Sequence, residues 1–201
     1  MSVRAGSPAF ADGYDSKGKS LYLTSDSIGI DASSVPDLRD AKYLYLSAWV
    51  KTTNNAHKRV LSYGHYGHSN GFVLQTTIGT GSSEIVGGVG DCAGGGAGKA
   101  IYYKSKGANI SDGKWHHIAM EFDFENNVSR MFKDGKQISD LLKDGGTGSV
   151  VGSEFIMNEC YDTGSGLYNQ PYRLCIGGGS HRCDQELFTG LIDEPTILIN
   201  Y

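Results

Sequence analysis

The sequence lacks an apolar run long enough to cross a membrane. Its longest apolar stretches, such as Tyr43–Val50, are far shorter than the roughly 20 residues that a membrane-spanning helix needs. The first residues, Met1–Pro8, contain no apolar core of the kind found in a signal peptide. We therefore expect no membrane insertion. The chain is either not secreted by the signal-peptide route or is a mature module with an added Met.

Positive charge is neither abundant nor clustered. The 201 residues include 18 Lys and Arg against 22 Asp and Glu, and the formal net charge is −4. Because nucleic-acid binding depends on a basic patch, nucleic acid is not an expected partner. Only four residues are Pro, and no stretch of a dozen residues keeps a clean helical period apart from one possible turn at Ser34–Arg39.

Cysteine is also sparse, with four residues at Cys92, Cys160, Cys175 and Cys183. No two of them have the Cys-x-x-Cys spacing of redox or zinc-knuckle sites. One interpretation is a disulfide from Cys160 or Cys175 to Cys183. Free, partly buried thiols are the preferred interpretation.

Glycine and tyrosine are abundant instead, with 29 and 12 residues. Short apolar or alternating runs are separated by clusters of Gly, Asn, Asp and Ser, which is typical of a β-sandwich or barrel. With no linker and no internal repeat, residues 1–201 are expected to form one domain. The predicted strands are Ser20–Leu23, Ile28–Ile30, Tyr43–Lys51, Arg59–Tyr63, Gly71–Thr77, Ile85–Gly88, Lys99–Lys104, Trp115–Asp123, Val128–Lys133, Lys136–Leu141, Leu174–Ile176 and Gly190–Ile199.

Alternation is clearest between Trp115 and Lys133. Even-numbered apolar residues from Ile118 to Phe124 point one way, and the odd-numbered residues between them point the other way. Asp134-Gly135 is a strong hairpin signal. The segment Trp115–Leu141 therefore predicts a three-stranded meander.

This meander resembles a known family. The run DGKWHHIA at Asp112–Ala119, followed by FKDGKQI at Phe132–Ile138, is similar to the core of laminin-G-like jelly rolls of the concanavalin A-like lectin/glucanase superfamily. Leu46–Lys51, Leu174–Gly179 and Phe188–Leu198 match further strands of that family in order. The resemblance implies an all-β, two-sheet antiparallel β-sandwich, in which Trp115 and one of the following histidines pack between the sheets.

The family contains lectins, adhesion modules and glycanases, so the fold alone does not set the function. Pro195 departs from the family pattern and predicts an edge or a bulge in the last strand. The run Glu121-Phe-Asp123-Phe-Glu125 looks like the E-x-D-x-E of retaining β-glucanases. It lies on the wrong strand for that role, so we interpret these carboxylates as a solvated acidic face and expect no enzyme activity.

The sequence contains candidate metal-binding residues. Relatives often hold one structural Ca²⁺ through the N-terminal segment and the closing strand. The matching Asp of the closing motif is Asp193, and Asp12, Gly13 and Asp15 could supply the other oxygens. The alternative is an Asp hydrogen-bonded at a strand end. Zinc is not favoured, because His65 and His68 have no evident third ligand.

The predicted ligand site lies in two loops rich in Tyr, His and Asn. Aromatic rings with neighbouring amides and carboxylates suit a sugar, because C–H groups stack on the rings while the hydroxyls form hydrogen bonds. The same composition also suits a protein surface. The candidate ligand-binding residues are His65, Tyr66, His68, Asn70, Tyr161, Asp162, Tyr168, Asn169, Tyr172 and Arg182.

Two functions follow from these residues. The first is a non-catalytic lectin-like or adhesion module that binds glycan or a surface protein through these loops, outside the cell or on a cell or virion surface. The second is a structural or decoration protein of a virion or other assembly, for which a homo-oligomer is expected. A glycoside hydrolase is a weak third alternative.

Overall fold

The structure is a computed structural model and describes ten parts of the chain. They are residues 2–5, 7–31, 41–63, 71–76, 83–91, 99–126, 128–139, 141–143, 173–179 and 182–201. Every strand pairing in them is antiparallel. The predicted helical turn at Ser34–Arg39 lies outside these parts.

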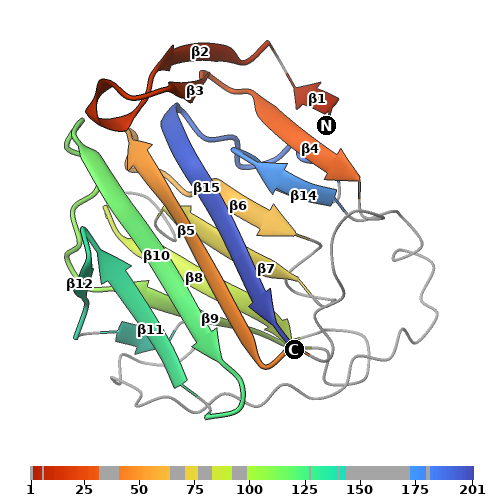
Figure 1. The fold of residues 1–201 in the computed structure, drawn as a ribbon, viewed down its shortest axis with the longest axis vertical. Helices are drawn as coiled ribbons and strands as arrows, with labels where there is room; N and C mark the ends of the chain where they lie inside the picture. The colour runs from red at the N-terminus through yellow and green to blue at the C-terminus, as the bar shows by residue number, and fades with distance from the viewer. Residues whose placement is uncertain are drawn as a thin grey trace.

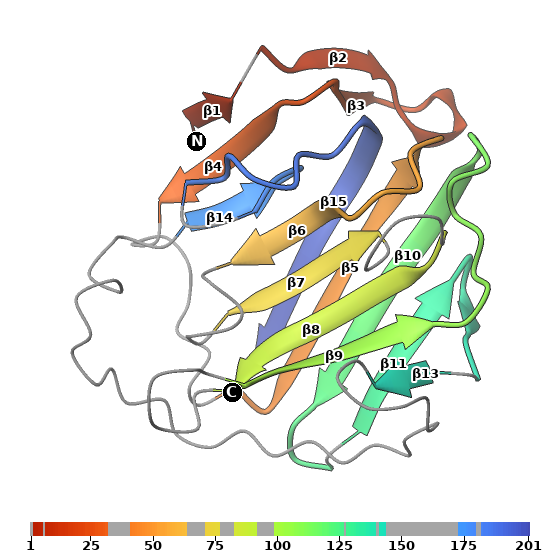
Figure 2. The same cartoon turned by 180° about the vertical axis from the view of Figure 1, so that it is seen from behind.

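The strands form two sheets that pack face to face (Figures 1 and 2). The seven-stranded sheet has the order β12 (Lys136–Gln137), β11 (Val128–Lys133), β10 (Trp115–Asp123), β5 (Tyr43–Lys51), β15 (Gly190–Asn200), β3 (Lys19–Leu23) and β2 (Ala9–Asp12). The eight-stranded sheet has the order β1 (Ser2–Ala5), β4 (Ser27–Asp31), β14 (Arg173–Ile176), β6 (Lys58–Tyr63), β7 (Phe72–Thr76), β8 (Ile85–Asp91), β9 (Lys99–Ser105) and β13 (Leu141–Lys143). The predicted two-sheet antiparallel jelly-roll sandwich is confirmed.

The core lies between the sheets because the central strands alternate. On β5 the side chains of Leu44, Leu46, Ala48 and Val50 are fully buried, while the residues between them face outward. Ile118, Met120 and Phe122 do the same on β10, and Phe72 and Leu74 meet them from the other sheet. Gly87 on β8 lies so close to Met120 that a Cβ there would overlap the methionine side chain. Glycine at this position lets the two sheets approach.

Strand boundaries agree with the sequence most closely in the seven-stranded sheet. Tyr43–Lys51, Trp115–Asp123 and Val128–Lys133 are found as predicted. The prediction of one strand at Lys136–Leu141 is wrong. Its first residues extend the meander as β12, and Leu141 begins β13, which pairs with β9 in the other sheet. The chain changes sheets here, which a short polar segment does not signal.

Two turn predictions are confirmed. Asp134 and Gly135 have φ angles of +50° and +75° and close the β11–β12 hairpin. In β15 the register shifts between Asp193 and Thr196, which is the bulge that Pro195 predicted. Glu194 has a φ of +47° in this bulge. The sequence did not predict β1, β2 or the 3₁₀ turn η1 (Tyr14–Ser16).

The prediction of free thiols is wrong for the two cysteines that the structure describes. Cys175 and Cys183 form a disulfide with a Cα–Cα distance of 5.4 Å. The chain after β14 turns back on itself, as the Gly179–Gln185 bridge shows, and this return brings Cys183 to β14. Cys92 and Cys160 lie outside the described residues. Within the described parts, no helix is long and apolar enough to cross a membrane.

Candidate functional site

Nearly all of the predicted ligand-binding residues lie outside the described part of the chain. Arg182 is the exception, and it is exposed in the turn before Cys183. The loop site therefore stays a prediction. The residues outside the described ranges are His65, Tyr66, His68, Asn70, Tyr161, Asp162, Tyr168, Asn169 and Tyr172.

The acidic run of β10 faces outward, as predicted, and its carboxylates have local partners. Arg130 Nη1 donates to Glu121 Oε1 at 2.6 Å. Asp123 accepts from the backbone N–H and the side chain of Asn126, and this hydrogen bonding lowers the pKa of Asp123. Glu125 lies beyond the end of β10, and its Oε1 is 3.6 Å from Lys42 Nζ. The three carboxylates therefore do not share one strand face.

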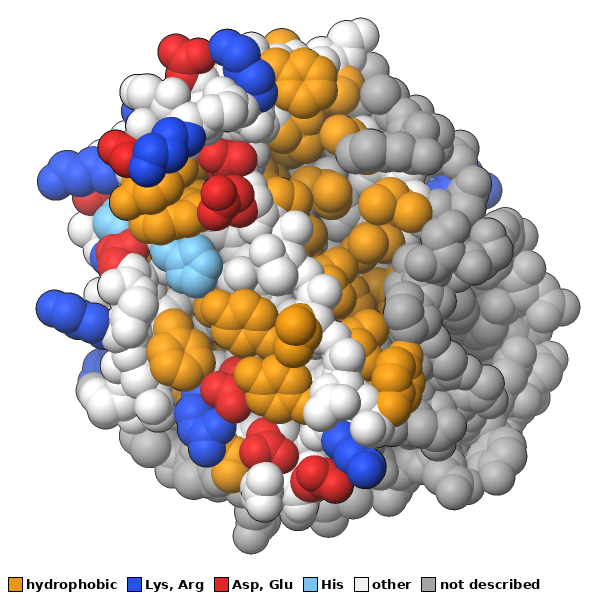
Figure 3. Space-filling model, in the orientation of Figure 1, with side chains coloured by type: hydrophobic (Ala, Val, Ile, Leu, Met, Phe, Trp, Pro, Cys, Tyr) orange, Lys and Arg blue, Asp and Glu red, His pale blue; other side chains and the backbone are white. Residues whose placement is uncertain are grey.

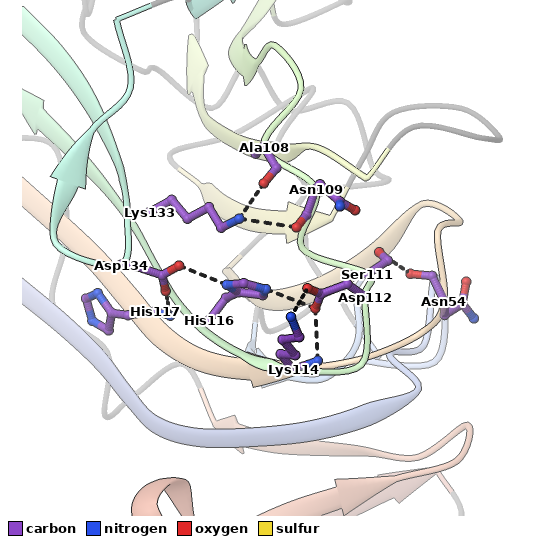
Figure 4. A network of polar contacts seen from close by, with 10 residues as sticks. All are labelled: Asn54, Ala108, Asn109, Ser111, Asp112, Lys114, His116, His117, Lys133 and Asp134. Atoms are coloured by element: carbon purple, nitrogen blue, oxygen red, sulfur yellow. Dashed lines mark hydrogen bonds and ion pairs between the residues drawn. The ribbon is translucent and has the colours of Figure 1, made fainter.

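His116 is the inward-facing histidine of the Trp-His-His triplet (Figure 4). Its Nδ1 lies 2.9 Å from Asp134 Oδ2, and its Nε2 lies 3.0 Å from Asp112 Oδ1. The backbone N–H of His117 donates to the other oxygen of Asp134. The Asp112 motif and the Asp134-Gly135 turn are thereby joined through one buried ring. This role is structural, and because His117 points to the opposite face, the two histidines do not share a metal ion.

Trp115 corrects an expectation of the family resemblance. Its side chain lies on the outer face of the seven-stranded sheet, not between the sheets, because it alternates with the inward-facing His116. Tyr14, from the 3₁₀ turn η1, stacks on Trp49 with ring centroids 3.5 Å apart and meets Trp115 edge-on at 6.3 Å. The ring of His117 lies edge-on to Trp49, with ring centroids 5.2 Å apart. These four rings, Tyr14, Trp49, Trp115 and His117, form what we call the ring cluster.

The donors proposed for calcium lie beside the ring cluster, but their oxygens are engaged with other groups. Asp193 Oδ2 accepts from the Tyr14 backbone N–H at 2.7 Å. Asp12 pairs with Lys19 at 2.9 Å, and Asp15 pairs with Lys17 at 3.1 Å. Gly13 packs against Asp193, since a Cβ there would lie 2.6 Å from Asp193 Oδ2.

All four predicted donors therefore have protein partners, since the Gly13 carbonyl accepts from the Ser16 backbone N–H at 3.1 Å. The described residues also contain no group of three or more His, Cys, Asp or Glu side chains that could hold a metal ion. Calcium binding at these residues therefore stays a prediction. The hydrogen bond from the Tyr14 backbone N–H to Asp193 agrees with the alternative, an Asp hydrogen-bonded at a strand end.

A second group of rings lies at the other end of the same outer face. Strand register places Arg130, Glu121, Tyr45 and Leu198 side by side on β11, β10, β5 and β15. Tyr43 precedes Tyr45 by two residues on β5, so both rings project outward. Both tyrosines are half-buried and Leu198 is 53% exposed. We call Tyr43, Tyr45, Glu121, Arg130 and Leu198 the tyrosine face.

The tyrosine face combines apolar surface with strong hydrogen-bonding groups. Figure 3 shows hydrophobic side chains over the central strands of this sheet, with acidic and basic side chains between them. Burial raises the pKa of Tyr43, and the neighbouring Glu121 carboxylate raises it further. The phenol therefore stays protonated at neutral pH and can donate a hydrogen bond. Flat rings beside a carboxylate–guanidinium pair are suited to sugar hydroxyls and C–H groups.

Sequence reasoning missed this face although a signal was present. Tyr43 and Tyr45 alternate with Leu44 and Leu46, which are the core positions of β5. Alternation alone therefore puts both tyrosines outside. The sequence could not show that Glu121 and Arg130 lie next to them, because that depends on the pairing of three strands.

Comparison with known proteins gives a family match and several similar folds. Residues 24–157 match the sequence model of the concanavalin A-like lectin/glucanases superfamily. No curated protein sequence matches the chain significantly. Domain 4 of AbnA, an extracellular GH43 arabinanase from Geobacillus stearothermophilus, solved with arabinotriose, is similar with a TM-score of 0.60 and 19% identity, covering 96% of this chain and 75% of that one.

Two further structures share the fold. The CBM40 of Ruminococcus gnavus IT-sialidase, bound to α2,3-sialyllactose, has a TM-score of 0.55 and 18% identity, with 87% of each chain covered. The enzymatically active domain of bacteriophage CBA120 tailspike protein 2 has a TM-score of 0.58 and 14% identity, and the match covers 98% of this chain but 28% of that one. At these identities the similarity establishes the fold.

Proposed function

The chain belongs to the concanavalin A-like lectin/glucanase superfamily, and on that premise we propose that it is a non-catalytic carbohydrate-binding module. The observation that carries the proposal is the tyrosine face, where two outward tyrosines lie beside the Glu121–Arg130 pair. Two proteins of similar fold were solved with an oligosaccharide, arabinotriose or sialyllactose. The predicted loops around His65–Asn70 and Tyr161–Tyr172 are a second proposed contact region.

The absence of catalysis is part of this proposal and has its own support. Glycoside hydrolysis needs two carboxyl groups facing each other across the scissile bond, one of them with a raised pKa. Glu121 is held by Arg130, and hydrogen bonds lower the pKa of Asp123. Neither feature suits a general acid.

An extracellular or surface location is proposed together with this function. The Cys175–Cys183 disulfide supports it, because disulfides persist in oxidising compartments and are rare in the cytosol. The glycan or surface-protein partner predicted from the sequence would be met in such a compartment.

A glycan array with the purified chain tests the proposal. We expect selective binding that falls when Tyr45 is changed to Ala, because the mutation removes a ring from the face. A protein that is folded and binds no glycan would contradict it. Hydrolysis of a bound glycan that is lost in Glu121→Gln would contradict the non-catalytic part.

An assembly or decoration role is the second candidate. It is favoured by exposed hydrophobic side chains on the edge strand β2 and at the C-terminal end of β15. Phe10 on β2 is 73% exposed, and Leu198 and Tyr201 are about half exposed, at 53% and 52%. Such side chains also suit contact with another protein. The oligomeric state of the purified chain separates this candidate from a glycan-binding module that acts as a monomer.

A further inference from the structure

We propose that the tyrosine face selects neutral oligosaccharides of at least two sugar units and rejects acidic sugars. This inference rests on the carbohydrate-binding function proposed above and specifies its ligand class. Three observations carry it: the spacing of the two tyrosines, the pairing of the charged groups, and the width of the face.

The two tyrosines offer two separate stacking positions. Tyr43 and Tyr45 are two residues apart on β5 and project to the same side, which places them about 7 Å apart by strand geometry. One sugar ring cannot cover both positions well. A ligand with two or more units makes both contacts and loses little further freedom in doing so.

The width of the face agrees with a ligand longer than one unit. Arg130, Glu121, Tyr45 and Leu198 stand on four adjacent strands. At about 4.8 Å between strands, this row is about 14 Å long. Polar groups lie at one end of the row and the exposed Leu198 lies at the other. The row therefore gives a sugar chain hydrogen bonds at one end and apolar contact at the other.

The charges on and around the face exclude an acidic sugar. Within the described part of the chain, the basic residues on or next to the tyrosine face are Arg130 and Lys42. Each of them is paired with a carboxylate, Glu121 and Glu125 respectively. Asp123, which lies opposite Tyr43 on β10, adds a further negative charge. An incoming carboxylate or sulfate would meet more negative than positive charge, because the charge of Arg130 is already balanced by Glu121.

The Glu121–Arg130 ion pair can still form hydrogen bonds with a neutral ligand. A guanidinium has five N–H donors, and the described contact with Glu121 engages Nη1. The other donors can reach sugar hydroxyls while the ion pair stays intact. Burial and, after it, the Glu121 carboxylate raise the pKa of Tyr43, so this phenol keeps its proton and can donate to a sugar oxygen.

The experiment is a calorimetric titration of the full chain with a defined set of sugars. Arabinotriose, cellotriose and mannotriose serve as neutral probes, their monosaccharides as single-unit probes, and sialyllactose as the acidic probe. We expect at least one neutral trisaccharide to bind about tenfold or more tightly than its monosaccharide. Its affinity should change little between low and high salt, because no net charge is neutralised.

Variants locate the site on the face. Tyr43→Ala and Tyr45→Ala should each weaken binding of that trisaccharide by about tenfold or more, whereas Tyr45→Phe keeps the ring and should retain most of the affinity. Tyr22→Ala is the matched control, because Tyr22 is an exposed tyrosine of the same sheet outside the tyrosine face. Circular dichroism and melting curves show that each variant is folded.

The outcomes separate the two proposals. Folded protein that binds none of the sugars overturns the carbohydrate-binding function itself. Salt-dependent binding of sialyllactose in preference to the neutral probes leaves that function standing and overturns the ligand class. Neutral binding that survives both alanine substitutions overturns the assignment to the tyrosine face and points to the loops.

Discussion

At the residue scale, neighbouring histidines of one strand have opposite environments. His116 points inward and lies between two carboxylates, whereas His117 points outward against Trp49. The two histidines of the Trp-His-His triplet therefore have different structural roles. One histidine joins two turns of the fold, and the other is part of the ring cluster.

His117 predicts a dependence of stability on pH. Partial burial lowers its pKa below 6.5, against the opposing pull of Asp134 and Glu194. The unfolded chain takes up a proton near pH 6.5 while the folded chain does not, so this contribution is complete above pH 6.5 and is lost as the pH falls through the lower folded pKa. We expect urea midpoints to fall between pH 7 and pH 5, and this fall to shrink in His117→Gln.

Asp112 is the internal comparison for that measurement. Its pKa is lowered, first by the hydrogen bond from the Lys114 backbone N–H, so its contribution to stability is lost only in more acid solution, below its ordinary value of 3.8. An Asp112→Asn variant should therefore keep the change between pH 7 and pH 5. If His117→Gln shows the same pH dependence as the original chain, another group is responsible.

At the scale of elements, the 3₁₀ turn η1 is held against β5 and the closing strand β15 by protein groups. The Tyr14–Trp49 stack and the hydrogen bond from Tyr14 to Asp193 hold it in place, and Asp15 and Ser16 adopt positive φ angles of 55° and 57° within it. Positive φ in non-glycine residues carries strain, which these contacts must offset. Calcium stays a prediction of the family resemblance.

The metal question is tested by chelation. We expect the melting temperature to be unchanged by EDTA, since Asp12 and Asp15 pair with lysines and Asp193 accepts backbone N–H groups. A melting temperature that drops with EDTA and recovers with CaCl₂ would support the calcium hypothesis.

The Tyr14–Trp49 stack predicts a separate effect on stability. Tyr14→Ala should lower the unfolding free energy by about 1–2 kcal/mol through loss of the stack.

The Cys175–Cys183 disulfide is a covalent link in the eight-stranded sheet. It joins β14 to the turn that follows and closes a short loop of eight residues' separation. Replacing both cysteines with Ser should lower the unfolding free energy by about 2–4 kcal/mol. Urea denaturation with and without reductant measures this, and a reductant that leaves the original chain unchanged would speak against a bridge in solution.

At the scale of the whole molecule, the two proposed functions predict different masses in solution. Charged groups interrupt the apolar side chains of the tyrosine face, which limits the continuous apolar area that a stable interface needs. We therefore expect sedimentation at the mass of one chain at micromolar concentration. A closed symmetric oligomer that dissociates on Leu198→Ser would instead favour the assembly role.

The sequence by itself determined the architecture. Alternation along Tyr43–Lys51 and Trp115–Lys133 and the Asp134-Gly135 turn were enough to predict the strands and their meander, and Pro195 predicted an edge or a bulge, because these signals are local. The two-sheet sandwich was predicted from the resemblance of these motifs to the superfamily. Tertiary structure alone decided which residues meet across strands. It placed Arg130 beside Glu121 and Tyr45, brought Cys183 to Cys175, and laid Tyr14 on Trp49. These contacts join residues that are far apart in the chain, so no local pattern encodes them.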